Sequence, residues 1–271
     1  MQKKITVKET VDGSETLMLA MSELYHASAG QDISGIMIDA LENGIWPENL
    51  VRNSSVITSS EQISLLKSKI VIVGLGGLGG YLATLAARAG IGGMSLADGD
   101  SFSPSNLNRQ VLCTKETMGN NKARVTSDVC LLINPALKTR VWETNFRKEN
   151  SADILEGADL VMDGLDQVKT RRLLFSGAVS ANIPFIHGAV SEWSGQTATF
   201  MPDHPEAMDS LYPENIRLPA AAPSVLSPVV AVIAGLQVQE AIRLLCGRSP
   251  ENSGKLIFYD GVKMEFQKVN L

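Results

Sequence analysis

The sequence predicts an α/β fold: a doubly wound, Rossmann-like, mostly parallel sheet with helices on both faces and a C-terminal antiparallel extension. Residues 70–73 are an unbroken β-branched run, which is typical of a strand buried on both faces of a parallel sheet. A glycine-rich turn follows at once, and stretches of helix and strand character then alternate up to residue 189. This alternation is the pattern of a doubly wound α/β domain.

The composition is that of a globular protein. The chain has 271 residues, of which 44% are hydrophobic and 20% charged, and its net charge is −5. No stretch contains the roughly 18 uncharged apolar residues of a membrane span, and the N-terminus lacks the apolar core of a secretion signal. Basic residues are scattered, which argues against nucleic acid as a partner. We therefore expect a cytoplasmic protein that binds neither membrane nor nucleic acid.

The elements divide into a short N-terminal part and a main domain. Residues 1–49 are expected to form an N-terminal helical extension, with helices near 17–25 and 33–41. A connector follows over 43–53, and a helix start is expected at 59. In the main domain, 50–271, strands are expected at 70–73, 94–97, 137–142, 160–163, 184–189, 196–201, 256–259 and 265–269, and helices at 81–89, 122–133, 170–181 and 225–245. Residues 203–223 form a Pro- and Ala-rich excursion of a length that usually carries function.

A glycine-rich turn follows the first strand of the main domain. Gly74, Gly76, Gly77 and Gly79 fit the pattern GxGxxG, in which a nucleotide approaches the backbone and the next helix N-terminus faces negative charge. Asp98 ends the second strand, at the spacing that accepts from ribose hydroxyls. The two features together predict a nucleotide site. The alternative is a packing turn beside an ordinary strand-end aspartate.

The segment after Asp98 is not one that a dehydrogenase carries after its ribose-binding acid. Arg109 supplies a planar fork of donors that suits phosphate, and Lys122 opens the next helix. Asn106 and Gln110 add neutral polar contacts. This set suits a triphosphate better than a nicotinamide. Lys122 could instead be a surface lysine at a helix start.

In six segments the sequence resembles the ThiF/MoeB/HesA family, the bacterial relatives of ubiquitin-activating enzymes. The segments are GLGGLGG (74–80), DGDSFSPSNLNRQ (98–110), GNNK (119–122), INP (133–135), DLVMDGLD (159–166) and YDGVKMEFQKVNL (259–271). Members adenylate the C-terminal glycine of a ubiquitin-like or sulfur-carrier protein. The resemblance implies a ThiF/MoeB-like ATP-binding adenylation domain over residues 50–271 and leaves residues 1–49 unexplained.

The resemblance also implies roles for single residues. The aspartate matching Asp98 holds the ribose, and the residues matching Arg109 and Lys122 hold the triphosphate, with Asn106 beside the phosphates. Asp166 matches the aspartate assigned to Mg²⁺, a hard cation that takes carboxylate and phosphate oxygens together. Asp166 could otherwise cap the following helix.

Arg52 matches an arginine that reaches the phosphates across a dimer interface. The match lies in the short string NLVRN (49–53) and implies a homodimer. The alternative is a solvated surface arginine. Asp100 and Asp163 are strand-end aspartates that could order the neighbouring loops, and His187 is either a satisfied strand-end histidine or a group that approaches the nucleotide.

The sequence departs from the family in its cysteines. Many members bind zinc through two CxxC pairs, and some carry a loop cysteine that bonds covalently to the carrier. This chain has Cys113, Cys130 and Cys246, none in a CxxC pair, so we expect no zinc site. Ala220 or a neighbour stands about where the loop cysteine would be, and covalent catalysis is therefore not expected. Adenylation itself needs no enzyme nucleophile, because the carrier carboxylate attacks the α-phosphorus.

The leading hypothesis is ATP- and Mg²⁺-dependent adenylation of a ubiquitin-like sulfur-carrier protein with a Gly-Gly C-terminus, releasing pyrophosphate, in thiamine or molybdopterin biosynthesis. Arg109, Lys122, Asp166 and Arg52 would stabilise the charge on the phosphates. Three alternatives remain. One is activation of a small-molecule or tRNA-borne carboxylate, as in a dehydratase-like branch of the family. The second is a non-catalytic ATP-binding module, and the third, from GxGxxG alone, is an NAD-dependent dehydrogenase.

Overall fold

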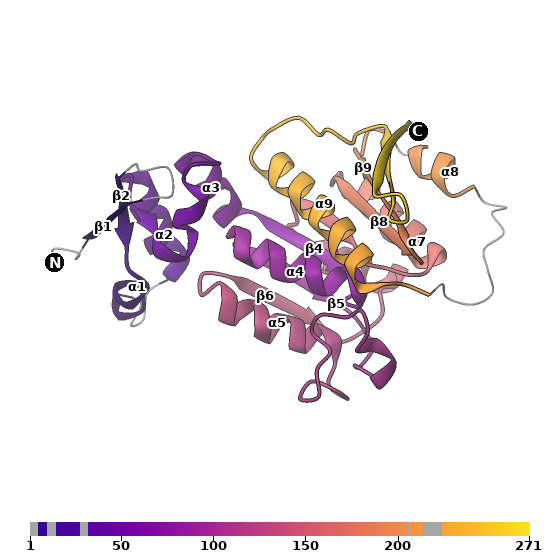
Figure 1. The fold of residues 1–271 in the computed structure, drawn as a ribbon, viewed down its shortest axis with the longest axis horizontal. Coiled ribbons are helices and arrows are strands. Elements are labelled where there is room, and N and C mark those ends of the chain that lie inside the picture. Colours follow the sequence, from indigo (N-terminus) through magenta and orange to yellow (C-terminus); the bar gives the residue numbers. More distant parts are fainter. Residues whose placement is uncertain (1–4, 10–14, 28–31, 205, 214–223) are drawn as a thin grey trace.

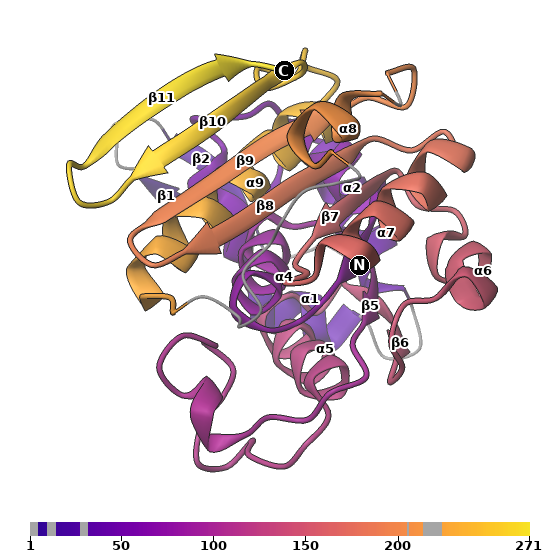
Figure 2. The same cartoon turned by 90° about the vertical axis from the view of Figure 1, so that its right-hand side faces the viewer.

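The computed structural model describes residues 5–9, 15–27, 32–204, 206–213 and 224–271 (Figures 1 and 2). Within these residues the main sheet has eight strands. Their order is β11-β10-β9-β8-β7-β4-β5-β6. Neighbours from β8 to β6 pair in parallel, and β8 to β11 pair antiparallel. The strands are β4 (Lys69–Val73), β5 (Gly93–Ala97), β6 (Lys138–Trp142), β7 (Leu160–Asp163), β8 (Phe185–Ser191), β9 (Ser194–Phe200), β10 (Lys255–Asp260) and β11 (Glu265–Asn270). The predicted fold class, with its C-terminal antiparallel extension, is confirmed.

Helices cover both faces of the sheet, so β4 is buried on both sides. Ile70 and Ile72 pack with the helices of one face, α4 (Gly77–Ala89), α5 (Lys122–Ile133) and α9 (Ser227–Leu245). Val71 and Val73 pack with those of the other face, α6 (Ser151–Leu155), α7 (Val168–Ser180) and α8 (Ala207–Leu211). The short α6 and α8 were not expected from the sequence, and α8 lies inside the excursion over 203–223.

Helix α4 begins at Gly77, earlier than the predicted start at residue 81. Glycine lowers helix propensity, so the pattern underestimates a helix whose first turn is glycine-rich. The helix ends at Gly90, which has a φ of +87°. Gly77, Gly79 and Gly80 thus belong to the helix itself, whose N-terminus lies at the carboxyl end of β4.

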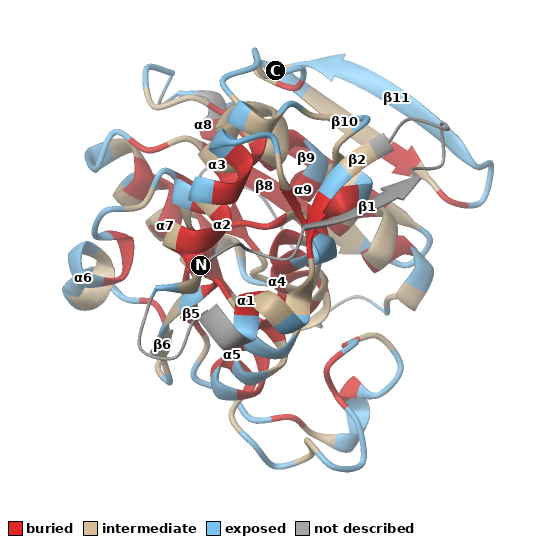
Figure 3. Ribbon diagram, turned by 90° about the vertical axis from the view of Figure 1, so that its left-hand side faces the viewer, coloured by how far each residue is buried: buried red, intermediate tan, exposed pale blue. Residues whose placement is uncertain are grey.

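Helix α9 is 19 residues long and, by length and composition, apolar enough to cross a membrane. It packs against α4, β8 and β9, and its residues Val230, Ile233 and Ala234 belong to the core of the main domain. At the outer edge of the sheet, by contrast, all six residues of β11 are exposed (Figure 3).

The N-terminal part contains the two expected helices but is not purely helical, so the expectation of a helical extension was incomplete. A small sheet combines β1 (Ile5–Glu9), β2 (Glu15–Leu19) and β3 (Trp46–Pro47), and it accompanies α1 (Met21–Ala27) and α2 (Ile33–Glu42). The pattern had assigned residues 17 and 18 to a helix, but antiparallel pairing with β1 makes them a strand. The turn η1 (Glu48–Asn53) and helix α3 (Ser59–Lys67) lead from this part into β4.

Candidate functional site

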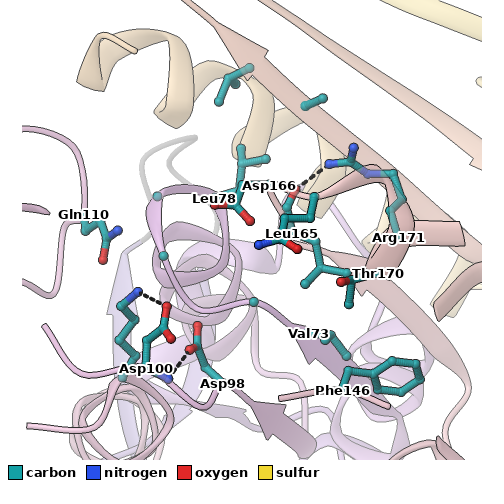
Figure 4. Close-up of a pocket in the computed structure, with 18 of the residues that line it drawn as sticks. Val73, Leu78, Asp98, Asp100, Gln110, Phe146, Leu165, Asp166, Thr170 and Arg171 are labelled. Atoms are coloured by element: carbon teal, nitrogen blue, oxygen red, sulfur yellow. Dashed lines mark hydrogen bonds and ion pairs between the residues drawn. The ribbon is translucent and has the colours of Figure 1, made fainter. Parts of the chain in front are cut away.

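A pocket of about 390 Å³ opens at the carboxyl ends of the central parallel strands (Figure 4). From β4 the chain goes on to β5 on one side, while β7 lies on the other, so this is the point where strand order reverses and ligands bind in doubly wound folds. Asp98 and Asp100 lie on one side of the pocket, and Asp166 and Arg171 on the other. The remaining lining residues are Val73, Gly74, Gly76, Gly77, Leu78, Ala97, Arg109, Gln110, Lys122, Asn145, Phe146, Gly164, Leu165, Gln167, Thr170, Ala189, Val190, Val225 and Val230.

The glycine turn both allows close backbone packing and lines the pocket, the two roles that the sequence left open. Gly74 has a φ of +83°, and a Cβ there would lie 2.7 Å from the carbonyl oxygen of Gly164. A Cβ on Gly79 would lie 1.9 Å from the carbonyl oxygen of Gly74, so these positions let three backbone segments touch. Gly74, Gly76 and Gly77 line the pocket, and the last two lie at the N-terminus of α4. Backbone amides and the helix dipole favour an anion at that place.

Asp98 holds the glycine turn and the following loop. Its Oδ2 accepts from the Leu75 amide at 2.6 Å, and its Oδ1 accepts from the Asp100 amide at 2.8 Å. Burial raises the pKa of Asp98 above its usual value, although these hydrogen bonds and nearby Lys122 oppose the shift. The carboxylate therefore lies in the pocket wall with its position fixed by backbone donors.

Two cationic side chains line the same side of the pocket. Lys122 is 7% exposed, and its Nζ lies 3.1 Å from Oδ2 of Asp100. Arg109 Nη1 donates to the Ser105 carbonyl and to Asn108. Gln110 is buried beside them, and its Oε1 has no hydrogen-bond partner within the described residues. Arg109 and Lys122 are the groups of this wall that could bind an anion, although Lys122 already pairs with Asp100.

Three predicted residues lie outside the pocket lining. Asn106 is buried and accepts from the Ser103 amide at 3.0 Å, so it shapes the loop that carries Arg109. Gly79 lies behind the turn, as described above. Arg52 lies in η1, whose Leu50 adjoins Gly90 at the far end of α4 from the pocket. Within one chain, Arg52 is therefore remote from the other predicted residues.

Asp166 is exposed in the pocket, just after β7 and close to the start of α7. The described residues contain no group of three or more His, Cys, Asp or Glu side chains that could hold a metal ion by themselves. A cation at Asp166 would thus need ligands from a bound molecule. This arrangement is usual for Mg²⁺, which combines one or two carboxylates with phosphate oxygens.

Behind Asp166 lies a buried polar network that the sequence analysis did not foresee. Asp163 Oδ2 accepts from Arg171 Nε at 2.6 Å and from His187 Nδ1 at 2.8 Å. The hydroxyl of Tyr212 lies 3.2 Å from His187 Nε2 and 3.1 Å from the amide nitrogen of Gln196. His187 is fully buried and does not line the pocket, which agrees with the satisfied strand-end histidine.

The charges in this network compensate one another. Arg171 and His187 lower the pKa of Asp163 despite its burial, and Asp163 raises the pKa of Arg171. Burial lowers the pKa of His187, so the imidazole is neutral near pH 7. Burial raises the pKa of Tyr212, which keeps its hydroxyl protonated. The network therefore holds one anion and one cation.

No cysteine of the described residues lines the pocket. Cys113 and Cys130 are buried, and burial raises the pKa of Cys130 to about 12. Burial also raises the pKa of Cys246. Thiols with raised pKa values are poor nucleophiles. The predicted position of the loop cysteine, at Ala220, lies outside the described residues.

The comparisons with known proteins agree on one family. The ThiF family model matches residues 50–271. The molybdopterin-synthase adenylyltransferase of Escherichia coli is 34% identical over 214 residues, which cover 78% of this chain and 86% of that protein. The probable adenylyltransferase/sulfurtransferase MoeZ of Mycobacterium tuberculosis is 32% identical over 219 residues, and this chain spans only 56% of its length.

Solved structures show the same fold. Escherichia coli MccB with AMPCPP and MccA has a TM-score of 0.69 and 23% identity, and the match covers 82% of this chain and 71% of that one. PaaA has a TM-score of 0.67 and 20% identity, covering 88% of this chain and 81% of that one. The motifs in the sequence, the sheet order and these comparisons lead to one conclusion: the chain belongs to the ThiF family.

Proposed function

We propose that this protein is an ATP-dependent adenylyltransferase that activates the C-terminal glycine of a ubiquitin-like sulfur-carrier protein ending in Gly-Gly. The observation that carries the proposal is the pocket itself. It combines a glycine turn at a helix N-terminus, a buried lysine, an arginine and an exposed aspartate at the switch point of the sheet. Relatives in Escherichia coli and Thermus thermophilus, named molybdopterin-synthase adenylyltransferase and sulfur carrier protein adenylyltransferase, support it.

The nucleotide would lie along the carboxyl ends of β4 and β5. Asp98 would accept from the ribose hydroxyls, while the amides at Gly76 and Gly77 face the phosphates. Lys122 and Arg109 would hold the triphosphate, with Gln110 beside them. A charge-assisted hydrogen bond of this kind contributes about 1.5–3 kcal/mol, so Lys122→Ala would weaken ATP binding about 10- to 150-fold.

Mg²⁺ fits the donor set only together with a nucleotide, because Asp166 would have to share the ion with phosphate oxygens. Bound there, the ion would neutralise charge between the phosphates and the incoming carboxylate. Asp166 would fix its position. The described residues contribute no zinc-like cluster, and the proposal includes no zinc site.

The carrier tail would enter from the side of β8, where Ala189 and Val190 line the pocket. Its carboxylate would attack the α-phosphorus, and pyrophosphate would leave toward Lys122 and Arg109. No enzyme nucleophile takes part in this step. Positioning and charge neutralisation would supply the rate.

The proposal includes a cytoplasmic homodimer in which Arg52 of one protomer reaches the phosphates bound by its partner. The distance of Arg52 from the pocket of its own chain supports this part of the proposal. Thiamine and molybdopterin biosynthesis are the pathways in which we expect the carrier.

ATP–pyrophosphate exchange tests the proposed function. The full-length protein is assayed with Mg²⁺ and a panel of carriers ending in Gly-Gly, and with the same carriers lacking the two glycines. We expect exchange only with the intact tails. ATP binding without exchange for every carrier would refute the proposal and favour a small-molecule acceptor or a non-catalytic module.

A further inference from the structure

The buried network behind Asp166 adds a role that the proposed reaction does not yet include. We propose that Arg171 is a positioning residue, held by Asp163, His187 and Tyr212, that fixes the turn presenting Asp166 to the nucleotide-bound metal. The proposal rests on the proposed function, because it concerns the metal that accompanies ATP.

Four of the five N–H donors of the Arg171 guanidinium are engaged by groups of the chain itself. Nε donates to Asp163, and Nη1 lies 3.4 Å from the Tyr212 hydroxyl. Nη2 donates to the carbonyl oxygens of Leu165 and Gly188, the latter at 3.3 Å. The side chain is only 3% exposed. Arg171 therefore acts through the groups that it holds, and not by touching the phosphates.

The two carbonyl groups that Arg171 holds belong to the segments next to the proposed metal position, the turn before Asp166 and strand β8. Arg171 donates to the carbonyl of Leu165, the residue before Asp166 (Figure 4). The Leu165 amide donates to Asp163 Oδ1 at 2.9 Å. One residue is thus clamped at its carbonyl by Arg171 and at its amide by the partner of Arg171. On β8, Gly188 precedes Ala189 and Val190, which line the pocket on the acceptor side. Arg171 joins the metal turn to that strand.

The network explains why a buried ion pair stays in one geometry. A buried carboxylate needs all its lone pairs satisfied, and Asp163 accepts from Arg171, His187 and the Leu165 amide. Because Nδ1 of His187 donates its proton in a hydrogen bond to Asp163, Nε2 carries no proton and accepts from the Tyr212 hydroxyl. The ring of Tyr212 also lies 5.3 Å from the Arg171 guanidinium carbon. Rotation of the guanidinium would break several of these contacts together.

A second arginine keeps Tyr212 in place from the outside. Arg172 donates to the Tyr212 carbonyl and to the Asp209 carboxylate on α8. The position of the tyrosine is therefore set by two neighbouring residues of α7, one buried and one half-buried. This arrangement gives two ways to loosen Arg171: directly, or through the hydroxyl of Tyr212.

The test measures metal binding instead of turnover. Mn²⁺ is titrated into the full-length protein saturated with ATP, and bound Mn²⁺ is followed by electron paramagnetic resonance; ATP affinity is measured separately in EDTA. Partners behind a metal ligand typically change metal affinity about 10- to 100-fold, and we expect that loss for Arg171→Lys. Tyr212→Phe should lose about two- to fivefold, the effect of one neutral hydrogen bond, since the ring and its packing remain. ATP affinity in EDTA should stay unchanged in both.

Matched controls separate positioning from general loosening. Arg243→Lys changes a half-buried arginine on α9, and Tyr259→Phe removes the hydroxyl of a buried tyrosine that donates to Met264 Sδ. Neither residue lines the pocket, and neither should change Mn²⁺ affinity.

A folded Arg171→Lys protein with the Mn²⁺ affinity of the wild type would overturn the proposal. If that variant does not fold, an unchanged Mn²⁺ affinity in Tyr212→Phe would overturn it. A wild-type protein that binds ATP but no Mn²⁺ with it would instead overturn the proposed function, and the positioning role with it.

Discussion

Replacing Asp100 by Asn is expected to tighten ATP binding, although it removes a charged residue from the pocket. The carboxylate of Asp100 lies 3.1 Å from Lys122 Nζ, and this ion pair is the only side-chain contact that we find for it within the described residues. ATP phosphates would have to displace it. Asp100→Asn keeps the shape and removes both the competing partner and the repulsion of phosphate.

The size of the effect follows from the exposure of the pair. The side chain of Asp100 is 67% exposed and that of Lys122 is 9% exposed, so solvent screens the attraction strongly. An ion pair of such intermediate exposure contributes about 0.5–1.5 kcal/mol. Its loss in Asp100→Asn corresponds to a dissociation constant for ATP about two- to tenfold lower than in the wild type. Higher salt should reduce the difference between the two proteins.

Isothermal titration calorimetry with ATP in EDTA measures this change without any contribution from metal. Glu156→Gln is the matched control, because Glu156 pairs with Arg140 away from the pocket and its loss should leave ATP affinity unchanged. Weaker ATP binding in Asp100→Asn would refute the reasoning, since Asp100 would then contact the nucleotide instead of competing with it.

Three further predictions concern stability and assembly. Gly79→Ala should lower the free energy of unfolding by at least about 2 kcal/mol, measured in urea, because its Cβ would lie 1.9 Å from the Gly74 carbonyl oxygen. His187 has a lowered pKa when folded, so stability should fall as pH drops below about 6.5, by up to about 1.4 kcal/mol per pH unit, and His187→Gln should reduce this slope in urea titrations at pH 5 to 7. An equal slope in both proteins would contradict it. Mixing inactive Arg52→Ala and Asp166→Ala proteins should restore part of the exchange activity through mixed dimers, and no recovery under subunit exchange would exclude the trans arginine.

The direction of the pH effect on stability follows from the lowered pKa of His187 in the folded protein. Asp163, Arg171 and Tyr212 are the titratable groups that face it. Between its folded and unfolded pKa values, only the unfolded chain carries the proton, and stability therefore rises with pH in that window. The lowered pKa of Asp163 acts at lower pH, below its unfolded value near 4.

Local sequence motifs identified several residues that the structure brings together in one pocket. The strand at residues 70–73, the glycine turn, Asp98 and Lys122 meet because each follows directly from a strand end or a helix start. Carboxyl ends of parallel strands converge at one edge, so residues at such ends come together without further information.

The network behind Asp166 could not be predicted, because its members come from separate elements. Asp163 ends β7, Arg171 lies on α7, His187 on β8 and Tyr212 after α8. Arg171 lies in the polar segment VKTRRLL, where nothing in the sequence indicates that this arginine is buried. Likewise, β1 and β2 are stabilised by pairing with each other, which the sequence of neither segment indicates alone. Residues 17 and 18 of β2 were therefore predicted to be part of a helix.

The most direct test of the central claim is ATP–pyrophosphate exchange with Mg²⁺, comparing the wild type with Asp166→Ala in the presence of Gly-Gly carriers. Adenylation predicts exchange that requires the carrier and is abolished by Asp166→Ala. Exchange that proceeds equally well in Asp166→Ala, or no exchange with any carrier despite ATP binding, would contradict the account.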